Sequence, residues 1–527
     1  MTTRSASNGI LFATPQAAAD LVAPGATIAI CGTANVGVPE SILAALGDRF
    51  RKSGAPGDLT LFFPVEPGDR PGIGIDHLAE PGMLSCLIGG SFIFTGSAEP
   101  ARTTTLVMEN RVAAYNLPMG VMFLLLRDIA AGRPGHITDV GLGTFVDPSL
   151  GGGKLTPLAT RDLVEHIEIN GETYLRYLPL TIDVALIRGT VADSRGNIAL
   201  DDEASMQGML AMAQAAKASG GIVIAEVQRT VSAGSLSPQS VRVPGAIVDV
   251  VVVDVAQEQL LGQPFRPELR GAGAPDGAAG FDVNSLPLAA QIVLRRARRE
   301  VRPGGRYNLG FGMAANLPVF AQDVIADENL YFFVEQGAVG GVPLPGLLFG
   351  TSFHPDALIE MPSWFDYLEG GAFTGSFLGF GEADEEGSVN NHRLGGMLSG
   401  CGGFIDITTR APKIVFCGTF TAGGLAVSWR DRRLVVEREG RHRKFVKRIS
   451  APTLSGPQCV KRAQSVTWIT ERAVLQLTDR GLLVTELAPG IGRDDLQAAA
   501  DCELHFAADL IEMDADLFRP TEEARIA

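Results

Sequence analysis

The chain carries one folding plan twice, and this duplication constrains its fold more than any other feature of the sequence. Residues 14–46 read as a helix, a Pro-Gly turn, an apolar strand, a loop and a second helix that Pro39 opens. Residues 288–322 repeat this order, and Pro318 opens the second helix there. The turn proline and the helix proline are 15 residues apart in both copies, at 24 and 39 and at 303 and 318. Because proline favours the first turn of a helix, the pattern predicts two related α/β units.

A second repeated pattern, a strand followed by an Asp-x-x-Gly turn, supports the duplication. The first copy, ALIRGTVADSRGNIAL, has Asp193 and Gly196, and the second, SFLGFGEADEEGSVNN, has Asp384 and Gly387. The helix proline and the turn aspartate are 154 residues apart in the first copy (39 to 193) and 66 in the second (318 to 384). The first half therefore holds 88 additional residues between these two points.

Length and composition agree with two domains. A chain of 527 residues exceeds one ordinary hydrophobic core, and its apolar content of 46% suffices for two. Glycine and proline are dense in GQPFRPELRGAGAPDGAAGFDVNSLP, as they are in linkers. We predict an N-terminal domain over residues 1–270, a linker over 271–287 and a C-terminal domain over 288–527.

Charge and cysteine content argue against several classes of protein. The net charge of −15 argues against a general nucleic-acid binder. None of the six cysteines forms a CxxC pair, so neither a metal site nor a disulfide framework is predicted. No stretch approaches about 18 uninterrupted apolar residues, and the first residues do not resemble a secretion signal. We therefore expect a cytoplasmic protein without a membrane partner.

One carboxylate has an unusual setting, in YFFVEQGAVGGVPLPG at 331–346. Four strand-forming residues lead to Glu335, and glycines follow it at once. Glycine lets a ligand or another loop come close to the backbone. No charged residue follows until Asp356, so an ionised Glu335 is costly unless hydrogen-bond donors hold it. A surface turn is the ordinary interpretation, but this pattern is also typical of a reactive carboxylate.

Three glycine-rich segments give weaker signals. GLGTFVDPSLGGGKLT fails as a phosphate-binding loop, because Pro148 replaces its first glycine and Leu155 follows the lysine. GFGMAA from Gly310 matches a loose dinucleotide-binding pattern, for which a structural turn is the better interpretation. We predict that the glycines of SGCGGFIDIT lead into a strand. The successive N–H groups of Gly402 and Gly403 can then face one developing oxyanion.

Motifs along the chain resemble family I CoA-transferases. In the first half these are GVPE, AYNLPMGV, RDIAAG and GLGTFVDPSLGGGKLT. In the second half they are VEQGAVGGVP, GGAFTGSFLGFGEADEEGSVN, SGCGGFIDIT, KFVKRI, ITERAVLQL and ELAPGI. The resemblance covers nearly the whole chain and is strongest to the fused-subunit acetate and propionate enzymes, which are similar to 3-oxoacid CoA-transferases. It implies two tandem homologous α/β domains with the active site between them.

This resemblance also implies a chemistry. Family members move coenzyme A from an acyl-CoA to a free carboxylic acid by a ping-pong route through covalent intermediates. Glu335 would be the nucleophile and would end as a glutamyl-CoA thioester. Gly402 and Gly403 would be the oxyanion donors, and Asn308 would be a polar neighbour of the glutamate, although a turn asparagine is nearly as good an interpretation. Coenzyme A is then a substrate, and neither a metal nor a further cofactor is implied.

Departures from the family pattern bear on the substrate. Where relatives are expected to read NLPQG, this chain has Met119, and where they are expected to read GGHWG, it has Gly90, Ser91 and Phe92. Both changes replace groups that hydrogen-bond or stack with apolar or smaller ones. The hypothesis is an acyl pocket that is more apolar or roomier than one made for acetate, with short-chain or somewhat more apolar acyl groups as substrates.

The resemblance further implies a homo-oligomer, a dimer or tetramer. Two other functions are left open by the residues. An acyl-CoA hydrolase could use the same glutamate if water reached the intermediate. A non-catalytic ligand-sensing protein could share the α/β fold, although it would have no reason to keep Glu335.

Overall fold

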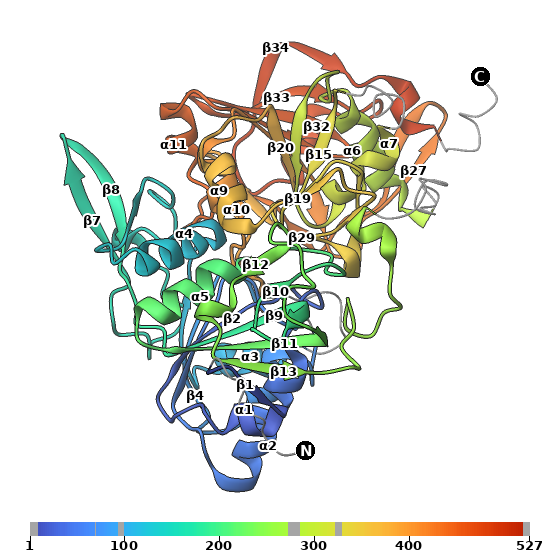
Figure 1. Cartoon of the computed structure of the whole chain (residues 1–527). Coiled ribbons are helices and arrows are strands. Elements are labelled where there is room, and N and C mark those ends of the chain that lie inside the picture. The colour runs from blue at the N-terminus through green and yellow to red at the C-terminus, as the bar shows by residue number, and fades with distance from the viewer. Residues whose placement is uncertain (1–8, 69, 93–99, 272–284, 322–328, 520–527) are drawn as a thin grey trace.

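The computed structural model describes residues 9–68, 70–92, 100–271, 285–321 and 329–519, which form two large β-sheets with helices around them. The first sheet uses strands between residues 11 and 253, and the second uses strands between residues 306 and 512. In Figure 1 the first sheet lies below the second, and the two chain termini lie at opposite ends of the molecule. The fold is therefore the predicted α/β fold with two sheet-centred halves.

The first sheet is parallel along its main path. The strand order is β1-β13-β11-β9-β2-β3-β4-β5, every neighbouring pair is parallel, and β10 and β12 attach antiparallel beside β9. Helices cover such sheets on both faces, which is why all ten residues of β9 are buried. The strands are β1 Leu11–Ala13, β2 Thr27–Ile30, β3 Leu59–Phe63, β4 Leu84–Gly89, β5 Ala113–Asn116, β9 Val184–Asp193, β10 Ile198–Ala199, β11 Ile222–Val231, β12 Val241–Val243 and β13 Val250–Val253. The helices are α1 Pro15–Ala19, α2 Glu40–Ser53, α3 Arg102–Met108, α4 Met119–Ala130 and α5 Met209–Ala218.

The second sheet is mixed. Its order is β19-β16-β15-β14-β20-β25-β31-β32-β33-β34. The pairs from β15 to β31 are parallel, the pairs among β19, β16 and β15 and among β31, β32 and β33 are antiparallel, and β33 and β34 are parallel. The strands are β14 Arg306–Leu309, β15 Tyr331–Phe333, β16 Ala338–Val339, β19 Ala357–Leu358, β20 Gly375–Leu378, β25 Lys413–Cys417, β31 Ser465–Ile469, β32 Ala473–Thr478, β33 Gly481–Leu487 and β34 His505–Glu512. The helices are α6 Leu288–Arg298, α7 Leu317–Phe320, α9 Met361–Glu369, α10 Phe404–Arg410, α11 Gly456–Lys461 and α12 Arg493–Ala498.

The two sheets share one core topology, as the duplicated sequence plan predicts. The order β13-β11-β9-β2-β3 in the first corresponds to β31-β25-β20-β14-β15 in the second. The repeated aspartate turns also match. Asp193 Oδ1 accepts from the N–H groups two and four residues later, and Asp384 Oδ1 does the same. Gly196 and Gly387 follow with φ of 78° and 76°.

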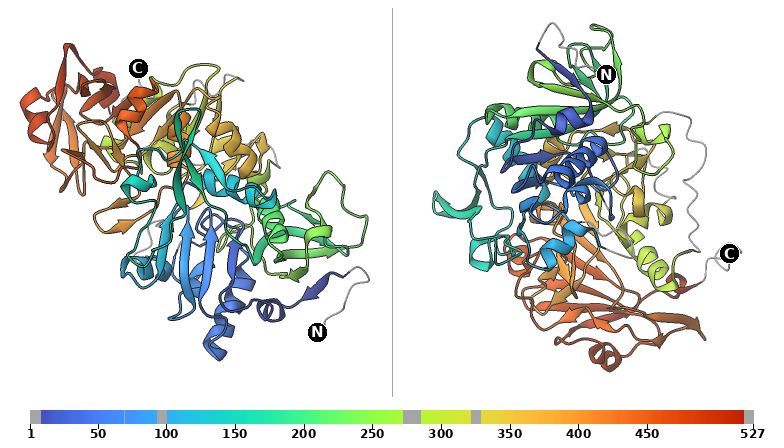
Figure 2. Two further views of the ribbon diagram at one scale, coloured as in Figure 1. Left: turned by 90° about the vertical axis from the view of Figure 1, so that its left-hand side faces the viewer. Right: turned by 90° about the horizontal axis from the view of Figure 1, so that it is seen from below.

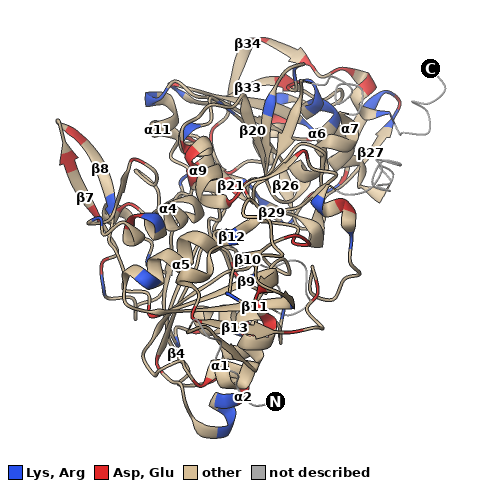
Figure 3. Cartoon of the chain, viewed as in Figure 1, with Lys and Arg blue, Asp and Glu red and all other residues tan. Residues whose placement is uncertain are grey.

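The 88 additional residues of the first half contribute to the domain interface. The longer segment between Pro39 and Asp193 contains β4, β5, α4 and a three-stranded sheet of order β6-β8-β7, with bounds β6 His136–Thr138, β7 Val164–Ile169 and β8 Glu172–Tyr177. The β7–β8 hairpin projects from the body of the molecule (Figures 1 and 2). Acidic residues occur near its tip, and elsewhere acidic and basic side chains are interspersed over both halves (Figure 3).

The two halves pack through helices that meet between the sheets. α4 lies under α9 and α10 (Figure 1), and the rings of Phe123 in α4 and Phe365 in α9 stack with centroids 6.3 Å apart. Asp406 of α10 accepts a hydrogen bond of 2.9 Å from the Val121 N–H at the start of α4. One hydrophobic cluster includes buried side chains from both halves. This continuous core holds the two halves in one fixed arrangement.

One predicted element is wrong. SGCGGFIDIT was expected to lead into a strand, but its FIDIT segment begins helix α10. The β-branched residues of this short stretch favour a strand, yet burial of Phe404, Ile405 and Ile407 in the core stabilises the helix. The predicted boundaries at 270 and 288 stay predictions, because residues 272–284 of the expected linker lie outside the described residues.

Candidate active site

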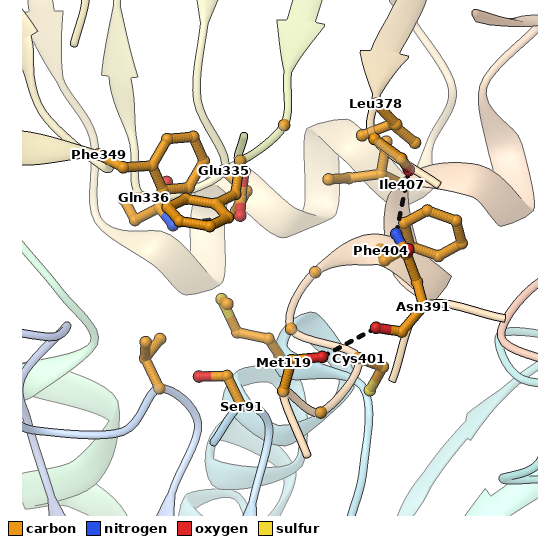
Figure 4. A pocket seen from close by; sticks show the side chains of 18 of the residues that line it. Ser91, Met119, Glu335, Gln336, Phe349, Leu378, Asn391, Cys401, Phe404 and Ile407 are labelled. Atoms are coloured by element: carbon orange, nitrogen blue, oxygen red, sulfur yellow. Dashed lines mark hydrogen bonds between the residues drawn. The ribbon is translucent and has the colours of Figure 1, made fainter. Parts of the chain in front are cut away.

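A cavity of about 390 Å³ lies between the two halves. The first half contributes Thr33, Val65, Ser91 and Met119 to its lining, and the second contributes Glu335, Gln336, Phe349, Leu378, Phe380, Asn391 and the segment 399–404 among others. Glu335 and Gln336 lie on one side in Figure 4, and Ser91 and Met119 lie opposite them. Most of the lining is apolar, with few side chains able to hydrogen-bond.

Glu335 enters this cavity directly after β15. Its side chain is 8% exposed, and burial raises its pKa from 4.5 to about 7, although hydrogen bonds from neighbouring groups partly oppose this shift. The Gln336 Nε2 amide donates to Glu335 Oε1 at 3.1 Å. Glu335 Oε2 has no hydrogen-bond partner in the described part of the chain. One carboxylate oxygen is thus held, while the other is free to react.

Asn308 in β14 lies beside this carboxylate. Its side chain is fully buried, and its Oδ1 accepts from Ser376 Oγ at 2.9 Å. Its proximity lowers the pKa of Glu335, yet Asn308 Nδ2 is not within hydrogen-bond geometry of any acceptor among the described residues. A buried unpaired donor is costly, yet Asn308 is fully buried and does not belong to the residues that line the cavity.

The structure corrects the pair of oxyanion donors expected from the sequence. The Gly402 N–H donates to the Gly90 carbonyl at 2.8 Å and is therefore occupied. The Gly403 N–H is not a donor in the hydrogen bonds found among the described residues. Gly403 also lies against the nucleophile candidate, since a Cβ at this position would be 3.2 Å from Glu335 Cγ. Of the two glycines, only Gly403 can offer its N–H to the cavity without first losing a bond.

Gly90 supports the site without lining it. A Cβ on Gly90 would lie 2.0 Å from the Pro64 carbonyl oxygen, so no larger residue fits there. Its own carbonyl accepts from Gly402 and from Asn116 Nδ2 at 2.7 Å. Asn116 in turn accepts from the Cys401 N–H at 2.8 Å through Oδ1. Asn116 therefore fixes the glycine loop of the second half on the first half.

The sequence did not single out Asn116, although it lies in the AYNLPMGV motif. A lone asparagine in a strand carries no signal for a contact with a loop 285 residues away. The only available clue was that both segments belong to motifs of the same family.

The remaining predicted acyl-pocket residues divide into two groups. Met119, the first residue of α4, and Ser91 line the cavity. The Phe92 side chain instead packs edge-on against Phe63 in the core of the first half, with ring centroids 5.7 Å apart, and is not part of the cavity lining. Aromatic side chains that do line the cavity include Phe349 and Phe380 of the second half.

Two other residues near the cavity are unsuited to acid–base or thiol chemistry. Burial raises the pKa of the Cys401 thiol well above its usual value, so a thiolate is disfavoured. Burial lowers the pKa of His392 to about 4, and its ring stacks on Phe145 at 3.9 Å. Gly310 and Phe311 of the GFGMAA segment are among the residues that line the cavity.

Among the described residues, no group of three or more metal-binding side chains is found. No helix in this part of the chain is long and apolar enough to span a membrane. The cytoplasmic location and the oligomeric state stay predictions.

Fold and site together define a two-domain α/β enzyme with a buried carboxylate between its domains. The coenzyme A transferase family profile matches residues 12–254. The acetate CoA-transferase YdiF of Escherichia coli K12 is 37% identical over 508 residues, which cover 95% of this chain and 94% of that protein. The caffeate CoA-transferase of Acetobacterium woodii is 37% identical over 521 residues, with coverage of 96% and 97%. The chain belongs to the coenzyme A transferase family.

Structural comparison agrees. The crystal structure of the acyl-CoA transferase YdiF from E. coli O157:H7 in a thioester complex with CoA superposes with a TM-score of 0.90, 34% identity and 98% coverage of both chains. Human succinyl-CoA:3-ketoacid coenzyme A transferase 2 is a more distant relative, 24% identical over 527 residues, with coverage of 95% and 91%. The family predicted from the sequence motifs is confirmed.

Replacing Glu335 by glutamine is expected to stabilise the protein at alkaline pH. Because folding raises the pKa of Glu335 from 4.5 to about 7, the folded state holds the proton more tightly, and stability falls as pH rises between these values. Above pH 7 the full penalty is present, on the order of 3 kcal/mol at about 1.4 kcal/mol per pKa unit. The Tm of Glu335→Gln should exceed that of the wild type at pH 8, with a smaller difference at pH 5. A lower Tm at pH 8, measured by circular dichroism, would contradict this.

Asn116→Ala is expected to destabilise the protein and to weaken catalysis together. The change leaves the Cys401 N–H without its acceptor and removes one of the hydrogen bonds accepted by each of the Gly89 and Gly90 carbonyls, which costs on the order of 1–3 kcal/mol. It also removes one of the hydrogen bonds that dock the loop carrying Gly403 on the first half. Urea unfolding should show the loss of stability, and kcat should fall at a temperature where the variant stays folded. A folded variant with wild-type kcat would show that the loop needs no such anchor.

Proposed function

We propose that this enzyme transfers coenzyme A from an acyl-CoA to a free carboxylic acid through a thioester on Glu335. The observation that carries the proposal is the state of this side chain: a buried carboxylate with a pKa of about 7 and one oxygen without a partner, in the cavity between the domains. Both sides of the cavity come from one chain, so the reacting groups proposed here need no second subunit. Coenzyme A acts as a substrate in this scheme.

The reaction proceeds in two attacks on two different carbonyl carbons. Glu335 Oε2 first attacks the thioester carbonyl of the acyl-CoA, and the carbon–sulfur bond breaks to give an acyl-glutamyl anhydride and CoA thiolate. The thiolate then attacks Cδ of Glu335. The bond from Cδ to Oε2 breaks, the first carboxylic acid leaves as its anion, and the glutamyl-CoA thioester remains. The acceptor acid reverses these steps.

A carboxylate is a weak nucleophile, so the site must compensate. Burial removes water from Glu335, and a poorly solvated carboxylate is more reactive than one in water. Gly403 lines the cavity beside Glu335, and its N–H can donate to an oxygen of the substrate. Contacts with the pantetheine and nucleotide parts of CoA then position the thioester.

The cavity favours acyl groups without a second charge. No Lys, Arg or His belongs to its lining among the described residues. A second carboxylate on the acyl chain would lose its hydration without gaining a counter-ion. Met119, Leu378 and Phe380 offer apolar contacts instead. We therefore propose monocarboxylic acids whose acyl chain carries no further charged group as substrates, including acids more apolar than acetate.

Incubation with an acyl-CoA and no acceptor tests the covalent step. Wild-type enzyme should gain the mass of CoA less one water, because the acyl group leaves as the free acid, and Glu335→Gln, checked for deamidation, should gain nothing. Glu226→Gln is the matched control, since Glu226 is also buried with a pKa of about 7 but lies outside the cavity lining. This control should form the adduct. Turnover to free CoA without an acceptor would instead indicate a hydrolase, and an adduct on Glu335→Gln would refute the assignment.

A panel of acceptor acids tests the substrate class. With the wild type, kcat/KM should be higher for butyrate than for acetate and at least 100-fold lower for succinate than for butyrate, about 3 kcal/mol of discrimination. Met119→Gln places an amide in the cavity and should shift the preference towards acetate. An unchanged chain-length profile in Met119→Gln would remove Met119 from the specificity argument. Equal use of succinate and butyrate would contradict the monocarboxylate preference.

A further inference from the structure

The proposed reaction places negative charge on two different oxygens in turn. During the first attack the charge develops on the acyl oxygen of the substrate. During the second attack, by CoA thiolate on Cδ of Glu335, it develops on Oε1 of Glu335 itself. A donor aimed at the first position does not serve the second, because the two carbonyl groups occupy different places. The site therefore needs a donor dedicated to Glu335 Oε1.

Gln336 already occupies that position. Its Nε2 lies 3.1 Å from Glu335 Oε1, within the range for an oxyanion donor. Both side chains line the cavity, and Gln336 is 3% exposed (Figure 4). The amide nitrogen faces the carboxylate because the amide oxygen would be repelled there, and Gln336 Oε1 has no partner among the described residues.

The position of Gln336 is fixed from both domains. Ser205, which is 2% exposed and belongs to the first half, donates from Oγ to the Gln336 carbonyl at 3.1 Å. On the other side Gly350 lies so close that a Cβ there would be 2.9 Å from Gln336 Cγ. These contacts leave the amide little freedom to turn away when the charge on its acceptor changes.

We propose that Gln336 is a catalytic residue, the oxyanion donor for the second half of the transfer. Its Nε2–H stays on Oε1 while Oε1 is first a carboxylate oxygen, then an anhydride carbonyl, then the oxyanion, and finally the thioester carbonyl. When the thiolate adds to Cδ, the electron pair moves to Oε1, where the bond to Gln336 is strongest. When the pair returns, the bond from Cδ to Oε2 breaks and the acid leaves. The assignment rests on the proposed function of Glu335.

This role differs from simple support of the nucleophile. A group that only packs beside Glu335 would change stability but not the pH dependence of the reaction. A group that only favours ionisation would lose its effect at a pH where Glu335 is already ionised, since the hydrogen bond from Gln336 lowers the pKa of Glu335. An oxyanion donor retains its effect at every pH.

The test is the Gln336→Met variant, which keeps the length of the side chain and removes the donor. Acyl-CoA is mixed with enzyme in the absence of acceptor, and adduct formation is followed by quenched-flow mass measurement between pH 6 and pH 9. Removing one oxyanion donor typically slows a reaction about 100- to 1,000-fold. We expect the rate of adduct formation to decrease by this factor and the decrease to persist at pH 9. The KM for acyl-CoA should stay within about threefold of the wild type, and the fall in rate towards low pH should begin at a higher pH than in the wild type.

Gln257→Met is the matched control, because Gln257 is buried, donates from Nε2 and lies outside the cavity lining. It should form the adduct at the wild-type rate. If the slower adduct formation of Gln336→Met disappears at pH 9, or if its rate equals that of the wild type, the inference is overturned and the role of Glu335 is unaffected. Failure of the wild type itself to form an adduct would instead refute the proposed function. If Gln336→Met does not fold, Gln336→Leu at pH 9 has the same expected decrease in rate, and a wild-type rate there overturns the inference.

Discussion

The active site depends on one set of hydrogen bonds, those that dock the glycine loop of residues 399–403 on the first domain. The Phe92 N–H donates to the Ser399 carbonyl at 2.8 Å, and the Met119 N–H donates to the Gly402 carbonyl at 3.0 Å. Together with the bonds to Gly90 and Asn116, they satisfy buried backbone groups that would otherwise be unpaired. A displacement of the loop would break several of them at once. The distance between the two sides of the cavity is thus set by backbone pairing.

Burial of Glu335 makes folding less favourable at neutral pH, and in the proposed mechanism the same burial makes its carboxylate more reactive. Its burial raises its pKa to about 7, so the ionised form that can react is also the form that destabilises the folded state. The large apolar cluster that spans both halves offsets this penalty. Such a compromise between stability and activity is common where a charged group must react in a dry site.

The sequence predicted the parts of the site that depend on local pattern. The repeated turns predicted the duplicated domain, and the position of a carboxylate between a strand and a run of glycines singled out Glu335 as a candidate site residue. The error at Gly402 has a different origin, because two adjacent N–H groups look equivalent in sequence, and only the contact with Gly90 shows that one is occupied. The α10 segment was misread for a related reason, since a short β-branched run forms a helix here through burial among distant residues.

Gln336 was missed although it adjoins Glu335, because nothing in a sequence shows where a side chain points after a strand ends. Its orientation depends on Ser205, which is 131 residues away, and on the space left by Gly350. Contacts of this kind are set by tertiary packing and become visible only in three dimensions.

The asymmetry of the Glu335 carboxylate connects these observations. In this mechanism one residue is first a nucleophile and then an electrophile, and the two roles make opposite demands on its oxygens. The attacking oxygen must have no strong donor, because a hydrogen bond would reduce its reactivity, whereas the other oxygen must have a donor that accepts growing charge. Oε2 has no hydrogen-bond partner among the residues that the structure describes, and Oε1 is bonded to Gln336. A carboxylate with hydrogen-bond donors on both oxygens would be more stable and less reactive. A carboxylate without any donor would have a higher pKa and would be protonated over more of the neutral pH range.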